Sequence, residues 1–192
     1  MKHLYILLFL ATQCSYGQIF TGQLIINGTP EYTQNQSDFV SEAGTQIDNQ
    51  PYESLSSETQ LSYTLDPTLL GGTSSEMCSA NIYKYRVYMH TQELPEGFSL
   101  EVKTTPNSGS RFPTEIAYDS FPLMGARDLS PSQGGAYIPL SNNGSAAVLV
   151  MEFIGCRTQV PVQFRYTPGP LENAGDYQIE VVYTVVASLL NM

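Results

Sequence analysis

The sequence predicts an all-β protein that forms a single antiparallel β-sandwich of about eight strands, with an immunoglobulin-like or jelly-roll arrangement. Three observations lead to this fold class. Apolar and polar residues alternate with period two in several segments, which is the pattern of a half-buried strand. Clusters of Gly, Asn and Pro separate these segments at short intervals. No segment of useful length has the 3.6-residue apolar stripe of a helix.

Eight segments show the alternation and are rich in Val, Ile, Thr, Tyr and Phe, the residues that favour strands. The predicted strands are residues 19–27, 60–65, 81–91, 98–104, 114–118, 146–153, 159–166 and 177–187. Residues 31–57 are polar, and we expect there either a long loop or a weak edge strand around Phe39 and Val40.

The pattern inside each strand predicts which of its faces are buried. Three predicted strands, residues 81–91, 98–104 and 159–166, have one apolar and one polar face, but residues 146–153 are apolar on both faces, which is typical of a central strand. In residues 177–187 one face is apolar throughout, and the other changes from polar to apolar at Val182 and Val186. We therefore expect this strand's second half to be covered on both faces, either by its own domain, which we favour, or by a neighbouring chain.

Residues 1–17 have the features of a secretory signal peptide. A basic residue precedes an apolar run at residues 4–11, small and polar residues follow, and cleavage after Gly17 fits this pattern. The run has about half of the ~20 residues that a membrane-spanning helix needs, and no later segment comes close. We therefore expect residues 18–192 to form one domain without a transmembrane segment, located outside the cell, in the periplasm or on the cell surface.

The cysteines predict one disulfide. Cys78 and Cys156 remain after removal of the signal peptide, and an even pair in an oxidising compartment points to a bridge. Closing a loop of this length would stabilise the domain by roughly 4 kcal/mol, and two separate buried thiols are the alternative. Cys14 suggests a lipid anchor instead of free secretion, but the residues before it are a poor match to the small apolar pattern of that processing.

The charge balance excludes one class of partner. The chain has 18 acidic and 8 basic residues, for a formal net charge of −10. A protein this acidic repels phosphate backbones, so we expect no nucleic-acid partner. Charged residues make up only 14% of the chain, and the abundant Ser, Thr, Asn and Gln suit an extracellular β-protein.

The sequence has no catalytic signature. His90 is the one histidine left after residues 1–17 are removed, and the chain has no Gly-x-Ser-x-Gly elbow. Among the carboxylates Glu152 is the first candidate, because it lies in the most apolar strand, although a solvent-facing charge is the simpler interpretation. The cysteines lack the other ligands of a zinc site, and Asp38 with Asp48-Asn49 is a weak hint of a calcium loop. We predict a protein that is not an enzyme and binds no metal and no cofactor.

A carbohydrate-binding or protein-binding module is the alternative function. Sugar sites on β-sandwiches present flat aromatic rings to the solvent, and the chain has 13 Tyr and no Trp. Exposed rings at Tyr83, Tyr85 and Tyr177 would favour binding of a polysaccharide. Burial of all three would weaken that hypothesis.

Two segments resemble a known family: YKYRVYMHTQELPEGFSLEVKTTP at residues 83–106 and VPVQFRYTPGPLENAGDYQIEVVYTVVA at residues 160–187. They are similar to small secreted β-sandwich proteins of Gram-negative bacteria. The Ala-Gly-x-Tyr turn and the long alternating strand after it resemble the end of fimbrial subunits of the colonisation-factor and spore-coat-protein type. The resemblance implies assembly by strand donation, in which the N-terminal strand of one subunit completes the sheet of the next.

The donor strand implied by this resemblance is QIFTGQLIIN, in which Phe20, Leu24 and Ile26 alternate. The alternative is that this strand pairs inside its own domain. The chain departs from the family at residues 188–192, which lack the penultimate aromatic residue of chaperone-recognised subunits. We therefore predict a non-enzymatic structural or adhesion protein, secreted or in the cell envelope and fimbrial-like, whose partners are its own subunits or other envelope proteins.

Overall fold

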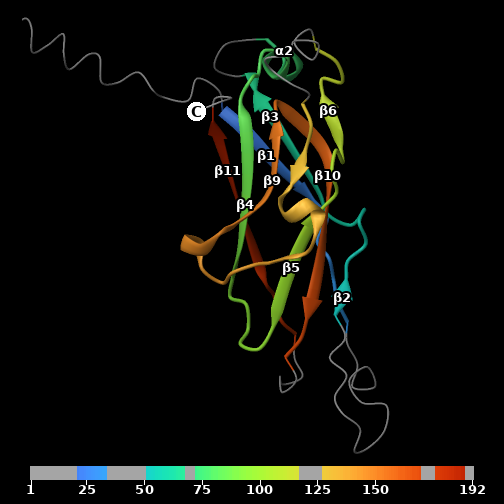
Figure 1. Cartoon of the computed structure of the whole chain (residues 1–192), viewed down its shortest axis with the longest axis vertical. Coiled ribbons are helices and arrows are strands. Elements are labelled where there is room, and N and C mark those ends of the chain that lie inside the picture. Colours follow the sequence, from blue (N-terminus) through green and yellow to red (C-terminus); the bar gives the residue numbers. More distant parts are fainter. Residues whose placement is uncertain (1–20, 34–50, 68–71, 117–126, 170–175, 189–192) are drawn as a thin grey trace, which may run out of the picture.

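The computed structural model describes residues 21–33, 51–67, 72–116, 127–169 and 176–188. These residues form two antiparallel sheets that pack face to face, which confirms the predicted all-β sandwich (Figure 1). The molecule is elongated along the strand direction, with the helix α2 at one end and the strand β2 near the other (Figure 1).

The larger sheet, called sheet 1 here, has the strand order β1-β3-β10-β5-β8, and β2 and β6 also pair with β10. Its members are β1 (Thr21–Asn27), β2 (Tyr52–Glu53), β3 (Gln60–Asp66), β5 (Ser99–Thr104), β6 (Ser110–Phe112), β8 (Ile138–Pro139) and β10 (Cys156–Thr167). The long strand β10 organises this sheet, because four other strands pair directly with it.

The smaller sheet, called sheet 2 here, has the order β11-β4-β9-β7. Its members are β4 (Lys84–Gln92), β7 (Ser130–Pro131), β9 (Val148–Ile154) and β11 (Glu180–Ser188). The doubly apolar strand β9 lies inside the sheet between β4 and β7, as its pattern predicts. The register between β4 and β9 shifts between Val87 and Tyr88, which is a β-bulge.

The core consists of the side chains that the two sheets turn toward each other. Among the side chains that are at most 1% exposed are Leu61, Val87, Met89, Val102, Val150, Met151, Val160 and Val162. β3, β4, β5 and β10 alternate buried and half-buried positions along most of their length, so they are one-sided strands with a wetter outer face. Burial of this apolar surface is the main favourable contribution to folding.

One predicted strand is wrong. Residues 114–116 are not part of a strand, and residues 117–118 lie outside the described residues; a short strand, β6, precedes them instead. The reason lies in a distant side chain. The guanidinium of Arg127 donates hydrogen bonds to the carbonyl oxygens of Pro113 at 2.9 Å and Thr114 at 3.1 Å, and these oxygens therefore serve a side chain and not a sheet ladder.

Short helical turns complete the fold. The helix α2 (Ser74–Ser79) starts with a capping box, in which Thr73 and Glu76 bond each other's backbone N–H groups. The described residues also include the 3-10 turns η4 (Ser132–Gly135) and η5 (Gly144–Ala146). The segment around Phe39 and Val40 lies outside the described residues, and the polar region contributes β2 instead.

Candidate interaction surface

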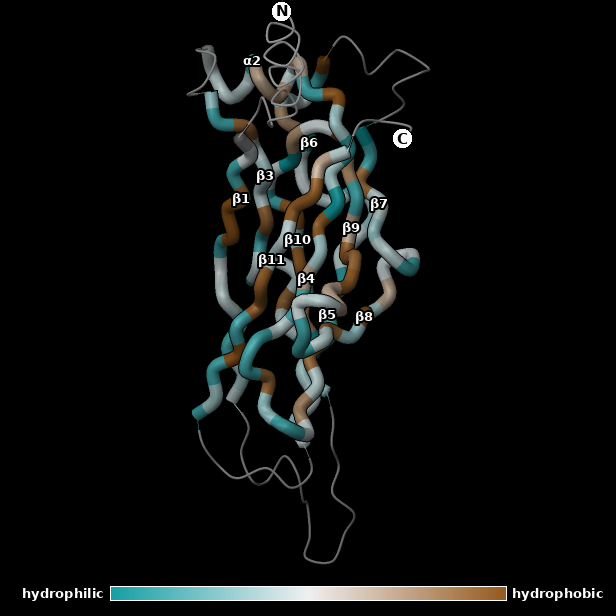
Figure 2. The backbone as a smooth tube through the Cα atoms, turned by 90° about the vertical axis from the view of Figure 1, so that its left-hand side faces the viewer, coloured by the Kyte–Doolittle hydropathy of each residue, from teal (hydrophilic) through white to brown (hydrophobic). Residues whose placement is uncertain are grey.

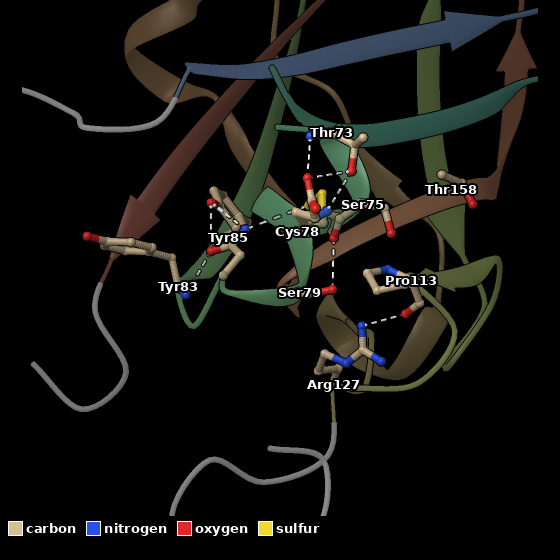
Figure 3. Close-up of a disulfide and its surroundings, with 12 residues drawn as sticks. Thr73, Ser75, Cys78, Ser79, Tyr83, Tyr85, Pro113, Arg127 and Thr158 are labelled. Carbon is tan, nitrogen blue, oxygen red and sulfur yellow. Dashed lines mark hydrogen bonds between the residues drawn. A yellow bond between two sulfur atoms is a disulfide. The ribbon is translucent and has the colours of Figure 1, made fainter. Parts of the chain in front are cut away.

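The predicted disulfide is present at the α2 end of the sandwich. Cys78 on α2 is bonded to Cys156 at the start of β10, with a Cα–Cα separation of 5.6 Å (Figure 3). Both cysteines are buried. Asn81 lies beside the bridge, where its amide donates to the Tyr85 hydroxyl at 2.9 Å and lies 3.8 Å from the Cys156 sulfur. The bridge joins the helix to sheet 1 inside the core, so its place is structural.

The two residues weighed for catalysis do not meet. Glu152 accepts ion pairs from Lys84 and Arg86, each at 2.6 Å, on the outer face of sheet 2. Partial burial opposes the charged form of Glu152, but the hydrogen bonds from the two cations prevail and lower its pKa. His90 is buried and lies next to Gly144 in the turn that precedes β9. A carboxylate held by two cations is a poor general acid or base at neutral pH.

The tyrosines do not form a flat sugar platform. Tyr85 is buried and Tyr83 is half-buried, while Tyr177 is 47% exposed. Tyr177 packs against Phe98, with ring centroids 5.1 Å apart, and Phe98 stacks on Tyr166 at 5.4 Å. Phe98 and Tyr166 are stacked, and Tyr177 is tilted by 52° against Phe98, so these rings pack on one another and do not lie side by side as a flat platform.

The strand edges on one side of the sandwich are protected. In Figure 2 β7 and β8 lie toward the right of the molecule. Each is only two residues long, and each ends in a proline, Pro131 or Pro139. Short edge strands and prolines are the usual devices that stop a sheet from pairing with another chain.

The edges on the other side, formed by β1 and β11, lack these devices. β1 has seven residues, TGQLIIN, with no charge and no proline, and its register with β3 is continuous. β11 has nine residues, EVVYTVVAS, with one charge at its first position and no proline, and it pairs with β4 without a bulge. In Figure 2 both strands lie toward the left of the molecule. We call this pair of edges the open side.

The core is incompletely covered along the open side. In β1, Leu24 and Ile26 pair with the core residues Tyr63 and Leu61, so their side chains face the interior, yet Ile26 is 40% exposed. In β11 the residues Val181, Tyr183, Val185 and Ala187 face the core and are all half-buried. Because these inward apolar side chains remain partly exposed to solvent, they can still be buried by apolar side chains of another molecule.

The outer face of β11 corrects one expectation. We predicted that its own domain would cover Val182 and Val186 on both sides. Val182 is half-buried, but Val186 is 44% exposed. β11 is the last strand of sheet 2, and no strand among the described residues lies beyond it. Val186 is therefore exposed because it lies on the outer face of sheet 2, next to Arg86 of β4, and at the edge of that sheet, a position that the sequence pattern alone does not indicate.

The candidate donor strand falls on the open side. Leu24 and Ile26 belong to β1, which pairs along all seven residues with β3 of its own chain, while Phe20 lies outside the described residues. This pairing is the alternative that the sequence left open. A donation of the strand to a neighbouring copy stays a prediction.

The comparisons with known proteins give no relative. No protein-family model, no curated protein and no solved structure matches the chain. Among the described residues, no helix has the length and apolar character needed to cross a membrane, and no group of His, Cys, Asp or Glu side chains is arranged to hold a metal ion.

Proposed function

We propose that the protein is a non-enzymatic structural or adhesion protein of the cell envelope, fimbrial-like, whose copies join by strand addition along the open side. The observation that carries this proposal is the contrast between the two sides of one molecule. The β7 and β8 edges are two residues long and end in proline, whereas β1 and β11 have seven and nine residues and one charge between them.

The contrast matters because an unprotected edge has a cost. A long edge strand presents a row of backbone N–H and C=O groups to any other extended chain, and natural proteins block such rows with charge, proline, bulges or short length. A chain that blocks one side and leaves the other open is adapted to pairing there. The half-exposed apolar residues Ile26, Tyr183 and Val186 give that pairing side-chain contacts as well as hydrogen bonds.

The chemistry of the surface supports a structural role. Glu152 is held by two cations and His90 is buried, so neither presents a free acid or base to a substrate. The polysaccharide alternative has less support, because the aromatic rings at the β2 end stack on each other. Secretion through residues 1–17 would deliver the protein to the compartment in which its disulfide forms.

The experiment that tests the proposal measures self-association by sedimentation velocity over a wide range of protein concentration. We expect the native protein to form larger species as its concentration rises. The double variant Ile25→Lys/Val186→Lys, which places one exposed lysine on each open edge, should stay monomeric. Lysine makes the net charge less negative, so general repulsion between copies cannot explain that loss.

A matched control carries the same charge change on the protected side. Ser130→Lys/Gln133→Lys alters two exposed residues at β7 and η4, and it should assemble like the native protein. A native protein that is monomeric at every concentration would contradict the proposal. So would a control variant that loses assembly to the same degree as the open-side variant.

A further inference from the structure

The sequence of β11 is nearly symmetric about its central residue. Each side of Thr184 has an outward-facing valine between two core-facing residues. These residues are Val181-Val182-Tyr183 before Thr184 and Val185-Val186-Ala187 after it. We propose that β11 pairs antiparallel with β11 of a second copy across a two-fold axis at Thr184, so that sheet 2 continues from one molecule into the next. This inference rests on the proposed function, and it names the strand that occupies the edge.

The register follows from the symmetry. An axis at Thr184 places Val182 opposite the partner's Val186, and it repeats the same pair on the other side of the axis. Tyr183 then lies opposite the partner's Val185 on the core side. Residues that face the same way stay together, because the register keeps the period of two. Pairs of β-branched and aromatic residues are among the favourable cross-strand pairs, and here they cover side chains that the single copy leaves half-exposed.

The charges select the antiparallel orientation. Glu180 stands at one end of β11, and Ser188 at the other end lies beside Lys84 of β4 in the sheet register. Pairing across the two-fold axis brings the partner's Glu180 next to Ser188, one strand away from Lys84 and on the same face. Lys84 and Arg86 both form ion pairs with the carboxylate of Glu152, so these three residues together carry one net positive charge. A parallel pairing would place two Glu180 carboxylates side by side.

The size of the contact is sufficient for a specific dimer. Nine facing residue pairs in an antiparallel ladder form about eight to ten backbone hydrogen bonds, because alternate pairs exchange two bonds each. A typical specific interface has about ten. Closed two-fold dimers are also the commonest symmetric assemblies, and a self-complementary strand suits that symmetry.

Cysteine cross-linking tests the register directly. In a Cys14→Ser background the only other native cysteines are the bonded pair. Thr184→Cys of one copy should be cross-linked to Thr184→Cys of the second copy by a short bis-methanethiosulfonate reagent, which reacts with one thiol at each end and releases sulfinate, because facing Cβ atoms in such a ladder lie about 5 Å apart. A mixture of Val182→Cys and Val186→Cys proteins should cross-link to each other. Val182→Cys protein alone, or Val186→Cys protein alone, should not cross-link, because the two identical positions in such a dimer lie about 13 Å apart along the strand.

The energetic test is the single variant Val186→Lys, which acts twice in a symmetric dimer. We expect it to raise the dimer dissociation constant by about tenfold or more. Ser130→Lys at the protected edge is the matched control and should leave the dissociation constant unchanged. Circular dichroism checks that each variant folds, and both changed side chains are exposed.

The outcomes separate this inference from the proposed function. If the protein assembles but Thr184→Cys does not cross-link, and Ile25→Lys blocks assembly while Val186→Lys does not, then copies join through β1. That result overturns the β11 pairing and leaves the proposed function in place. A protein that is monomeric at every concentration overturns both.

Discussion

The two ends of the sandwich are held together by different kinds of interaction. At the α2 end, a disulfide and two buried arginines tie loops to β10. At the β2 end, four aromatic rings from separate segments pack in a row, with two neighbouring pairs stacked and the third tilted. The rings are Tyr32, Tyr166, Phe98 and Tyr177, with neighbouring centroids 5.5, 5.4 and 5.1 Å apart. One end therefore depends on a few directional bonds, and the other on shared apolar surface.

The arginines at the α2 end act through carbonyl oxygens. Arg157 is 3% exposed and donates to the backbone oxygens of Ser108 and Arg127, each at 2.8 Å. Burial lowers the pKa of Arg157, and the nearby cation of Arg111 adds to the effect. Buried charged groups cost free energy unless they are hydrogen-bonded, so this network loses much of its value if one member is removed.

The aromatic row should tolerate the loss of one side chain better than the arginine network does. Stacked rings contribute mainly through buried area, and neighbouring side chains can relax into a lost contact. Tyr177 at the end of the row is partly exposed, whereas Phe98 inside it is buried. The comparison therefore predicts large effects of changes at the α2 end and graded effects at the β2 end.

The largest effect should come from removing the disulfide. We expect Cys78→Ala/Cys156→Ala to lower the free energy of unfolding by roughly 4 kcal/mol, because the bridge closes a long loop in the unfolded chain. Urea titration followed by circular dichroism measures the loss. Reduction of the native protein should have a similar effect, and a loss below about 1 kcal/mol would show that the α2 end does not depend on its bridge.

A smaller effect is expected in the aromatic row. Phe98→Ala should lower the free energy of unfolding by about 3 kcal/mol, at the low end for a buried phenylalanine because the site lies at the end of the sandwich. Phe98→Leu keeps most of the apolar volume and removes the ring contacts with Tyr166 and Tyr177, so it should cost about 1 kcal/mol. Equal losses of unfolding free energy in the two variants would contradict the view that the row is stabilised in proportion to the apolar surface that it buries. The same urea titration compares them.

The seven longer strands could be predicted because alternation is a local property. Each of them overlaps a predicted segment, with ends that differ by a few residues. The α2 helix was missed because six residues are too few for a periodic stripe, although Thr73 and Glu76 form a capping box that is visible in the sequence. Residues 114–118 were predicted as a strand because the pattern contains no sign of Arg127, which bonds the carbonyl groups of Pro113 and Thr114 from a later segment.

The candidate surface was only partly predictable. The apolar outward face of β11 is visible in the sequence at Val182 and Val186, but its meaning depends on whether β11 is central or at an edge. Strand order is set by contacts between distant segments, which periodicity does not encode. The same holds for the protected side, because β7 and β8 are two-residue pairings that form only after β5 and β9 are in place.

The smallest effect concerns pH and compares the two ends through their tyrosines. Burial raises the pKa of Tyr32 at the β2 end to about 12, with a smaller opposing contribution from Ser54. Since the folded protein holds this proton more tightly than the unfolded chain, the resulting stability is complete below the ordinary value of about 10. It is then lost as the pH rises from about 10 through 12.

Tyr32→Phe removes this contribution, so the free energy of unfolding of the variant should fall less steeply than that of the native protein above pH 10. Tyr63→Phe at the α2 end is the matched variant, since burial raises the pKa of Tyr63 even further. Its effect should therefore extend to higher pH than that of Tyr32→Phe. Urea titrations at a series of alkaline pH values measure both slopes. If Tyr32→Phe does not change the slope of unfolding free energy against pH, then the Tyr32 hydroxyl is as exposed to solvent in the folded protein as in the unfolded chain.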